Sequence, residues 1–250
     1  MLKQIKNTVI KIDRFFYKKF GKEKKLYFLE NLKEAKIIFS HLNKNSKISQ
    51  VMFVGGCVRK ALKDENIDDI DLATSIQPND VKDILLKEDI RVIETGISHG
   101  TVTAILNKIK FEITTLREDI TTDGRHANVQ FTKSWENDAS RRDITINAIY
   151  ADIDGKIFDP LNGVYDLQNG LVQFIGSPEE RIQEDYLRIL RYFRFFIQYS
   201  KTDHDPNIIK SIKQYIDGIN KISNERIFDE LKKILVLKNI YKLFYDKPSK

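Results

Sequence analysis

The segment Val51-Met-Phe-Val-Gly-Gly-Cys-Val-Arg59, followed by Asp69-Ile-Asp-Leu-Ala-Thr74, decides the fold. A short apolar run that ends at two glycines is typical of a strand entering a tight turn, and Val58–Leu62 then predicts a helix. Residues 69–73 alternate, which predicts a second strand with both aspartates on one face and Ile70 directed into the core. Together these patterns predict an α/β unit.

The glycine turn is a candidate phosphate site. Glycines let a backbone approach a ligand, and the N-terminus of the following helix offers free N–H groups to an anion. Arg59, in the first turn of that helix, adds a charged donor beside Gly55 and Gly56. Neither a Walker A loop nor G-x-G-x-x-G is present, so the turn by itself is equally typical of an ordinary α/β unit.

The acidic residues Asp69 and Asp71 are candidate metal ligands. Two carboxylates on one strand face can hold hard divalent cations, of which Mg²⁺ is the usual one. Glu112 lies on the predicted strand 110–114 and would supply a third carboxylate if that strand neighbours the aspartates. Polar strand faces exposed to solvent are the alternative, and these residues alone leave both interpretations open.

The rest of the chain changes character near residue 175. Further predicted elements are helices at 26–42 and 78–86, strands at 101–106 and 110–114, a long loop at 116–138, a helix at 141–149, strand-like pieces at 150–158 and 171–175, and helices at 178–199, 208–219 and 224–237. Only helices follow residue 175, so we divide the chain into a basic segment 1–25, a first domain 26–175 and a helical domain 176–250.

Composition limits the class of protein. The 250 residues are 41% hydrophobic and 31% charged with a net charge of +6, which is typical of a globular protein. No apolar run approaches the roughly 20 residues of a membrane span. The single cysteine, Cys57, excludes an internal disulfide framework and a multi-cysteine zinc site, so we expect a reducing, cytoplasmic location. The acid-poor N-terminus also suits a transit peptide, although it is rich in lysine rather than in arginine and serine.

Basic residues gather in three places. Residues 1–25 are strongly basic, which suits a polyanion such as nucleic acid, although the whole chain is rich in lysine. Arg141 and Arg142 can bind phosphate, or pair with Asp138 and Asp143 as a structural cluster. A third array recurs every three residues along the predicted helix 178–199: Asp185, Arg188, Arg191 and Arg194. A carboxylate beside a guanidinium can pair with the polar edge of a nucleobase, and a salt-bridged helix surface is the alternative.

Seven motifs in a fixed order carry a resemblance to a known family. They are Phe53-Val-Gly-Gly-Cys-Val-Arg59, Asp69-Ile-Asp-Leu-Ala-Thr74, Asp123-Gly-Arg-His126, Arg141-Arg-Asp-Ile-Thr-Ile-Asn-Ala148, Asp159-Pro-Leu-Asn-Gly163 with Asp166-Leu167, Glu184-Asp-Tyr-Leu-Arg188 and Ile222-Ser-Asn-Glu-Arg-Ile227. In this order they resemble class II tRNA nucleotidyltransferases, the CCA-adding enzymes, which are related to bacterial poly(A) polymerases. The resemblance covers about residues 26–237.

The resemblance implies an α+β fold, with a polymerase-β-like nucleotidyltransferase head built on a mixed or antiparallel sheet and an all-helical neck. Residues 159–167 would be the hinge between them, and 222–235 a neck helix that buttresses the base-reading helix. The resemblance implies that Asp69 and Asp71 bind metal, with Glu112 as a third acid, and that Gly55, Gly56 and Arg59 hold the triphosphate. Arg142 would contact the nucleotide, with Arg141, Asp143 and Asn147 beside the ribose. Asp185 and Arg188 would form a protein template that reads the base, with Arg191 and Arg194 behind them.

The implied reaction adds CMP and AMP from CTP and ATP to the 3′ end of tRNA with Mg²⁺, and releases pyrophosphate. A poly(A) polymerase is one alternative, which the motif at 123–126 opposes. A non-catalytic RNA-binding remnant, or one half of a two-chain enzyme, is another. Relatives continue into a body and tail that grip tRNA, whereas this chain ends soon after the last motif, so a partner chain is expected to supply that anchor. Lys60 also stands where the family usually has aspartate.

Overall fold

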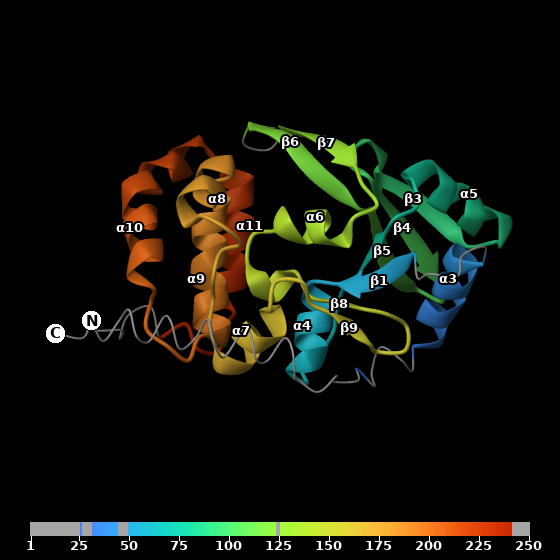
Figure 1. Ribbon diagram of the computed structural model, residues 1–250, viewed down its shortest axis with the longest axis horizontal. Coiled ribbons are helices and arrows are strands. Elements are labelled where there is room, and N and C mark those ends of the chain that lie inside the picture. Colours follow the sequence, from blue (N-terminus) through green and yellow to red (C-terminus); the bar gives the residue numbers. More distant parts are fainter. Residues whose placement is uncertain (1–25, 27–31, 45–49, 124–125, 242–250) are drawn as a thin grey trace.

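The computed structural model describes residue 26 and residues 32–44, 50–123 and 126–241 (Figure 1). The basic segment 1–25 and residues 27–31 of the first predicted helix lie outside these ranges. The described elements are α3 (Lys33–Asn43), β1 (Val51–Val54), α4 (Gly56–Leu62), β2 (Ile70–Thr74), α5 (Pro78–Lys87), β3 (Arg91–Gly96), η1 (Ile97–His99), β4 (Thr101–Leu106), β5 (Ile109–Thr115), β6 (Arg117–Asp123), β7 (His126–Phe131), α6 (Trp135–Ser140), η2 (Thr145–Asn147), β8 (Tyr150–Ala151), β9 (Ile157–Phe158), α7 (Gly163–Asn169), α8 (Pro178–Glu184), α9 (Leu187–Tyr199), α10 (Pro206–Tyr215), η3 (Ile216–Lys221) and α11 (Asn224–Leu235).

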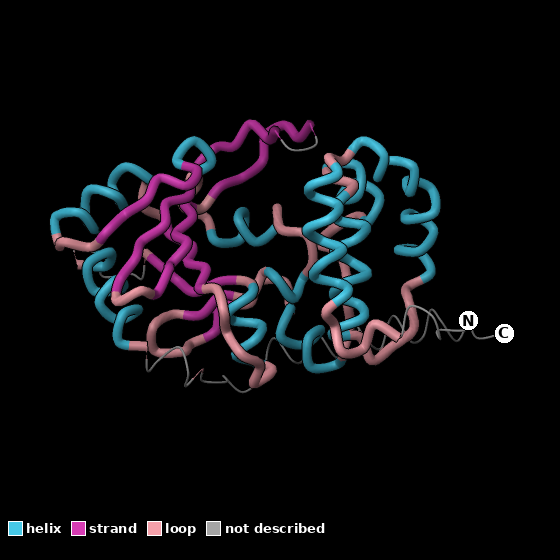
Figure 2. Tube along the Cα trace, turned by 180° about the vertical axis from the view of Figure 1, so that it is seen from behind, coloured by secondary structure: helices cyan, strands magenta, loops and turns pink. Residues whose placement is uncertain are grey.

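A mixed sheet forms one half of the molecule. Its seven strands have the order β3-β4-β5-β2-β1-β8-β9, and β6 and β7 form a separate two-stranded sheet. Strands β2 and β5 run parallel, and the other described pairs are antiparallel. Figure 2 shows the strands in one half and helices α8–α11 in the other. The expected α+β head with a mixed sheet and a helical neck is confirmed.

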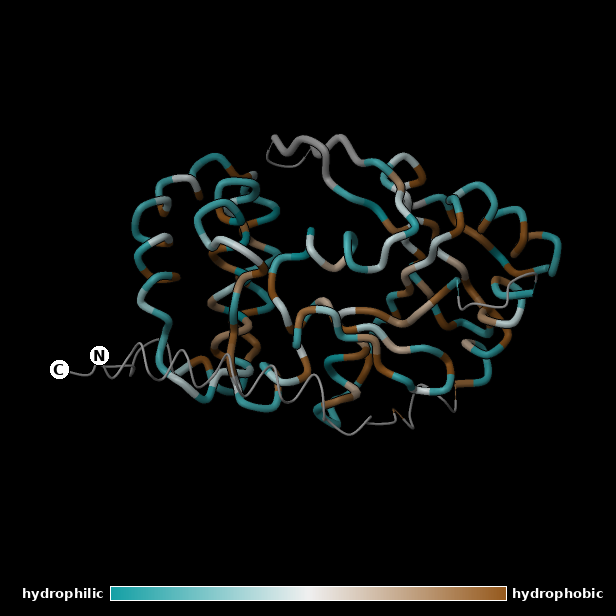
Figure 3. The backbone as a smooth tube through the Cα atoms, viewed as in Figure 1, coloured by the Kyte–Doolittle hydropathy of each residue, from teal (hydrophilic) through white to brown (hydrophobic). Residues whose placement is uncertain are grey.

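The two faces of the sheet have different surroundings. Along β1, Val51 and Phe53 belong to a large apolar core shared with α3 and α5, whereas Met52 and Val54 contact a smaller apolar cluster on the other face. Figure 3 shows the hydrophobic residues concentrated along the strands and the helices packed on them. Strand β2 repeats the alternation, with Leu72 in the large core. Its odd-numbered neighbour Asp71 therefore projects from the opposite face.

The large core continues from the sheet into the helices. Buried side chains from α8, α9 and α10 belong to the same cluster as those of β1 and β2, among them Ile182, Phe196 and Ile208. Residue 175 therefore marks a change in secondary structure rather than a gap in the core, and the division placed there stays a prediction. Among the described residues, no helix is both long and apolar enough to cross a membrane.

The prediction of a loop over 116–138 is wrong. Residues 117–123 and 126–131 form the paired strands β6 and β7, and α6 follows, with the Ser134 hydroxyl accepting a hydrogen bond from the Asn137 N–H at 3.1 Å. The hairpin is polar, so its strands lack the apolar alternation that predicts a strand. The edge strand β3 was also missed, and the predicted strand 171–175 contributes only a bridge between Phe174 and Ile144.

The predicted helix over 141–149 is also wrong, because polar contacts compete with helical hydrogen bonds. The segment holds only the short η2. The Asp143 carboxylate accepts from the Ile144 N–H at 2.9 Å, and the Thr145 N–H donates to Gln173 O at 3.1 Å. Local bonds to an aspartate side chain and β-branched residues both disfavour a helix.

The predicted helix over 178–199 is interrupted. Asp185 has φ −157° and ψ 108°, which ends α8, and α9 begins two residues later. The Asp185 carboxylate accepts from the Leu187 N–H at 3.1 Å, so it satisfies the N–H of the first residue of α9. Asp185 therefore stands at a corner of the backbone, not on a continuous helix face with Arg188.

Gly163, where α7 begins, is expected to tolerate no side chain. A Cβ at this position would overlap the carbonyl oxygen of Thr145 and approach Cγ1 of Ile149 to 2.8 Å. We expect Gly163→Ala to lower the free energy of unfolding by about 1–3 kcal/mol, the usual cost of overpacking. Urea unfolding measures it. Gly96→Ala is the control, because its Cβ would meet nothing closer than Thr101 Cβ at 4.0 Å. Equal stability of the two variants would contradict this packing.

Candidate functional site

Two carboxylates face each other across the parallel strands. Asp71 on β2 is the register partner of Glu112 on β5, and Phe111 and Ile113 lie buried on the other face. Asp69 is exposed and immediately precedes β2, which begins at Ile70. Burial and the negative charges of Glu112 and Asp69 raise the pKa of Asp71 to about 6, against the opposing effect of two nearby arginines. The condition set for Glu112, that its strand neighbours the aspartates, is confirmed.

The donors at this place suit a hard cation by their chemistry. No three His, Cys, Asp or Glu side chains in the described ranges are already gathered into a metal site. Asp69, Asp71 and Glu112 are nevertheless all carboxylates, the ligands that Mg²⁺ prefers. Burial raises the pKa of Asp71 most, and the repulsion from Glu112 and Asp69 that adds to it is what a bound cation would relieve. Binding would require these side chains to draw together.

The glycine turn lies between Asp71 and Arg142. Gly55 has φ +68°, in the region that favours glycine, and its N–H donates to Ile149 O at 3.1 Å. A Cβ on Gly55 would lie 3.6 Å from Arg142 Nη1, and one on Gly56 would lie 3.7 Å from Asp71 Oδ2. The two glycines therefore keep open the space beside one cation and one anion.

Arg142 is held by the buried carboxylate of Asp138. Arg142 Nη2 donates to Asp138 Oδ2 at 3.0 Å, the Tyr150 hydroxyl donates to the same oxygen at 2.7 Å, and Arg141 Nε donates to Oδ1 at 2.9 Å. Burial acts to raise the pKa of Asp138, but the charges of Arg142 and Arg141 outweigh it and hold the pKa at about 2. Asp138 is 1% exposed, so this paired charge fixes both guanidinium groups.

A second buried carboxylate, Asp143, links the sheet half to α9. Arg191 donates to Asp143 Oδ2 through Nε at 2.7 Å, and Asn147 Nδ2 donates to Oδ1 at 2.9 Å. Burial alone would raise the pKa of Asp143, but the Arg191 charge holds it well below its usual range. Asn147 Oδ1 in turn accepts from Arg59.

Arg59 points along this chain of contacts toward α9. It is 6% exposed, and its guanidinium carbon lies 4.8 Å from the ring centre of Phe195 and 5.2 Å from that of Tyr199. Its Nε atom is buried without a hydrogen-bond partner among the described residues. Arg59 also lowers the pKa of Asp71, so its charge acts on the acidic group from the side of the helices.

Asp185 and Arg188 have separate partners. Arg226 on α11 donates to Asp185 Oδ2 through Nη2 at 2.7 Å, whereas Arg188 donates to Glu184 and, at 3.1 Å, to the carbonyl of Arg181. Behind them Arg191 binds Asp143, and Arg194 Nε donates to Glu230 at 2.5 Å. The three arginines of the periodic array therefore pair with three different carboxylates, and its aspartate pairs with Arg226.

Sequence reasoning missed three of the residues that hold the site. Glu184 neighbours Asp185 and is spaced i,i+4 from Arg188, so its pairing could have been inferred. Tyr150 and Glu230 gave no such signal. Their partners Asp138 and Arg194 lie 12 and 36 residues away in the sequence. Lys60, the departure from the family motif, forms an ion pair with Asp68 at 2.7 Å.

Comparisons with known proteins identify the family that this chain resembles. Residues 51–173 match the family model described as poly A polymerase head domain, and residues 204–246 match the model described as probable RNA and SrmB-binding site of polymerase A. The mitochondrial CCA tRNA nucleotidyltransferase 1 of Homo sapiens is 47% identical over 225 residues, which are 88% of this chain and 51% of the relative. The CCA-adding enzyme of Streptococcus uberis is 41% identical over 192 residues, or 76% and 46% of the two chains.

Solved structures give the same result. The Bacillus stearothermophilus CCA-adding enzyme in complex with CTP superposes with a TM-score of 0.70 at 34% identity, covering 80% of this chain and 47% of that one. The Thermotoga maritima CCA-adding enzyme complexed with tRNA has a TM-score of 0.69 at 21% identity over 89% of this chain and 53% of that one, which supports the fold alone. The chain spans about half the length of the curated relatives it matches.

The pairing of Asp138 predicts acid sensitivity. Its pKa of about 2 is below the value of about 3.9 expected in the unfolded chain, so the unfolded state binds more protons between these values. The stabilisation is complete above about pH 4 and is lost as the pH falls toward 2, at up to about 1.4 kcal/mol per pH unit. Urea unfolding followed by Trp135 fluorescence measures it. Asp138→Asn should flatten the slope and the exposed Asp83→Asn should not, and equal slopes would contradict the assignment.

Proposed function

The chain belongs to the family of class II CCA-adding enzymes and poly(A) polymerases, of which it holds the head and neck, and on this premise we propose that it adds CMP and AMP from CTP and ATP to the 3′ end of tRNA, releasing pyrophosphate. The observation that carries the proposal is the register pairing of Asp71 with Glu112 beside an open glycine turn and Arg142. Acidic groups and phosphate-binding groups then lie within one small region, as nucleotidyl transfer requires.

Asp69 and Asp71, with Glu112 as a third acid, are proposed to hold Mg²⁺. When bound there, the cation would lower the pKa of the attacking 3′-hydroxyl and stabilise negative charge on the transferred phosphate. The protein's own part is to keep the carboxylates on one face, beside a turn with no side chains in the way.

The triphosphate is proposed to lie over Gly55 and Gly56, between Arg142 and Arg59. Arg142 is fixed by Asp138 and so needs no reorganisation to meet negative charge. The buried, unpartnered Nε of Arg59 supports a role for that guanidinium in meeting an anion. Asp143 and Asn147 would set the ribose side through their contacts with Arg191 and Arg59.

Asp185 and Arg188 are proposed to read the base. Cytosine and adenine each present an amino donor beside a ring-nitrogen acceptor, which match a carboxylate and a guanidinium. Uracil and guanine present the opposite order. Reading would exchange the bonds that Asp185 and Arg188 now make with Arg226 and Glu184 for bonds to the base. Arg191 and Arg194 would hold α9 in place behind them.

Anchoring of the tRNA is proposed to involve a partner chain. Helix α11 carries exposed apolar side chains at helical spacing, Phe228, Leu231 and Leu235, which offer a surface for such a partner. The match of residues 204–246 to an RNA-binding family segment supports RNA contact near α10 and α11. A cytoplasmic location suits a chain whose single cysteine is a free thiol.

Purified protein, tRNA lacking its CCA end and Mg²⁺ test the reaction, with CTP and ATP given singly and together. We expect extension by CMP with CTP alone and a complete CCA end with both. A poly(A) polymerase would leave the RNA unextended with CTP alone. A tRNA that is bound but never extended would instead indicate an RNA-binding remnant, or a subunit that needs its partner.

Loss of a metal ligand should stop the reaction without unfolding the protein. We expect Asp71→Asn to lower the rate of nucleotide addition by about a hundredfold or more with CTP and with ATP, since it removes one charge from the metal site. The exposed Asp83→Asn on α5 is the matched control. Circular dichroism checks the fold, and wild-type turnover by Asp71→Asn would refute the metal assignment.

Base choice should depend on the neck. We expect Asp185→Ala and Arg188→Ala each to relax discrimination against UTP and GTP by roughly ten- to a hundredfold, because each removes a hydrogen bond to a charged group, worth about 1.5–3 kcal/mol. Asp229→Ala, which breaks an exposed ion pair with Lys232 on α11, is the control. Single-nucleotide incorporation with all four triphosphates measures it. If a variant lowered the incorporation rates of all four triphosphates by the same factor, the base-reading role would be refuted and these residues would be only a salt-bridged surface.

A further inference from the structure

The two ends of the proposed site stand on two different helices. Helix α4 begins at the glycine turn, beside Asp71, and α9 begins next to Asp185. In the proposed function, the start of α4 contacts the phosphates of the nucleotide and the start of α9 contacts its base. The angle between the two helices therefore decides whether both parts fit the same nucleotide.

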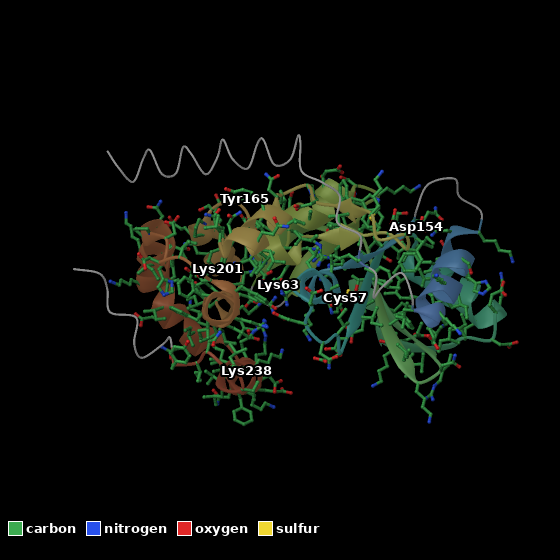
Figure 4. The ribbon with its side chains drawn as sticks, turned by 90° about the horizontal axis from the view of Figure 1, so that it is seen from below. Cys57, Lys63, Asp154, Tyr165, Lys201 and Lys238 are labelled. Carbon is green, nitrogen blue, oxygen red and sulfur yellow. The ribbon has the colours of Figure 1, made fainter. Side chains whose placement is uncertain are left out.

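The far ends of these helices meet at Glu65. Tyr199, the last residue of α9, donates its hydroxyl to Glu65 Oε2 at 2.9 Å, and Gln198 Nε2 lies 3.4 Å from the same oxygen. Figure 4 labels Lys63, just after α4, and Lys201, just after α9, which mark these two helix ends. Tyr199 is 6% exposed, so the bond is sheltered from water at its α9 end.

Glu65 is rigidly attached to α4. The helix ends in a Schellman motif, in which Asp64 has φ +56°, its N–H donates to Ala61 O at 3.3 Å and the Glu65 N–H donates to Lys60 O at 2.9 Å. The backbone of Glu65 therefore follows any movement of α4. Because Tyr199 also packs 5.2 Å from the guanidinium of Arg59, α4 touches the last turn of α9 at two points.

We propose that Glu65 is a positioning residue that sets nucleotide selectivity by fixing α4 against the C-terminal end of α9. The inference rests on the proposed function, and it adds a residue that contacts neither nucleotide nor metal. Helix α9 has 13 residues and is therefore about 20 Å long, so a rotation of about 3° at Tyr199 displaces its first turn by about 1 Å. Displacements of that size in a positioned site cost up to about a hundredfold in rate.

The groups of the site that lie in the sheet half explain why loss of the Glu65 contact should change nucleotide selectivity, and not the rate alone. Asp71 and Glu112 are held by the ladder of β2 and β5, and Arg142 is held by Asp138, so neither depends on Glu65. Loosening the contact would leave the acidic residues and Arg142 in place and displace the base-reading end relative to them. The correct base would then lose more of its matched bonds than an incorrect base, which has fewer to lose.

The experiment compares single-nucleotide incorporation of CTP and UTP on tRNA lacking its CCA end. We expect Glu65→Ala and Tyr199→Phe each to lower the ratio of kcat/KM for CTP to that for UTP by roughly tenfold. Glu65→Gln keeps an acceptor for the Tyr199 hydroxyl and should retain the wild-type ratio. Tyr215→Phe is the matched control, since it removes a tyrosine hydroxyl that donates to Glu179 within the neck.

The outcomes separate the two proposals. Wild-type protein that incorporates neither nucleotide would overturn the proposed function and the positioning role with it. Selective wild-type protein with unchanged ratios in Glu65→Ala and Tyr199→Phe, or an equal fall in Tyr215→Phe, would overturn the positioning role alone. If Glu65→Ala does not fold, Tyr199→Phe decides, because it deletes one hydroxyl. A ratio does not depend on the folded fraction of a preparation, so a purely structural defect would not move it.

Discussion

The ion pair between the buried Asp143 carboxylate and Arg191 links the sheet half to the helical half of the molecule. Its partners lie 48 residues apart in the sequence, and Asp143 is the buried one, so loss of Arg191 would leave a buried carboxylate without its partner, which costs about 3–5 kcal/mol. Asp138 plays the same part five residues earlier, inside the sheet half. The irregular backbone from 141 to 149, the place of Arg142 beside the glycine turn and the reach of Arg59 toward α9 all follow from satisfying these two carboxylates.

The sequence predicted those elements whose side chains alternate cleanly. Strands β1, β2, β4 and β5 and helices α4 and α5 lie within a residue or two of their predicted bounds. The hairpin β6–β7 was missed because both of its strands are polar. The break at Asp185 was missed because the apolar spacing continues across it. One helix ends and the next begins where the Leu187 N–H donates to the Asp185 carboxylate. Polar side chains and their hydrogen bonds decided each of these errors, and apolar periodicity does not record them.

The candidate site shows the same division between local and distant information. The sequence alone predicted that Asp69 and Asp71 lie on one strand face and that Ile70 is directed into the core. That Glu112 lies opposite Asp71 depends on β5 pairing with β2 in parallel, which no local pattern specifies. Likewise Arg226 and Glu230 were parts of a segment assigned to support α9, but their individual partners, Asp185 and Arg194, follow only from the way α11 packs on α9.

Cys57 lies at the centre of this arrangement. Its Sγ is buried between the carbonyl oxygens of Val54 at 3.3 Å and Asp71 at 3.5 Å, and burial together with the Asp71 charge raises the pKa of the thiol to about 11. A thiol in that state resists alkylation and oxidation, because the thiolate is the reactive form. It becomes reactive only when α4 lifts from the sheet. Since the chain has no other cysteine, the rate at which Cys57 is labelled would report how often the segment with the glycine turn and α4 separates from the strand that carries Asp71.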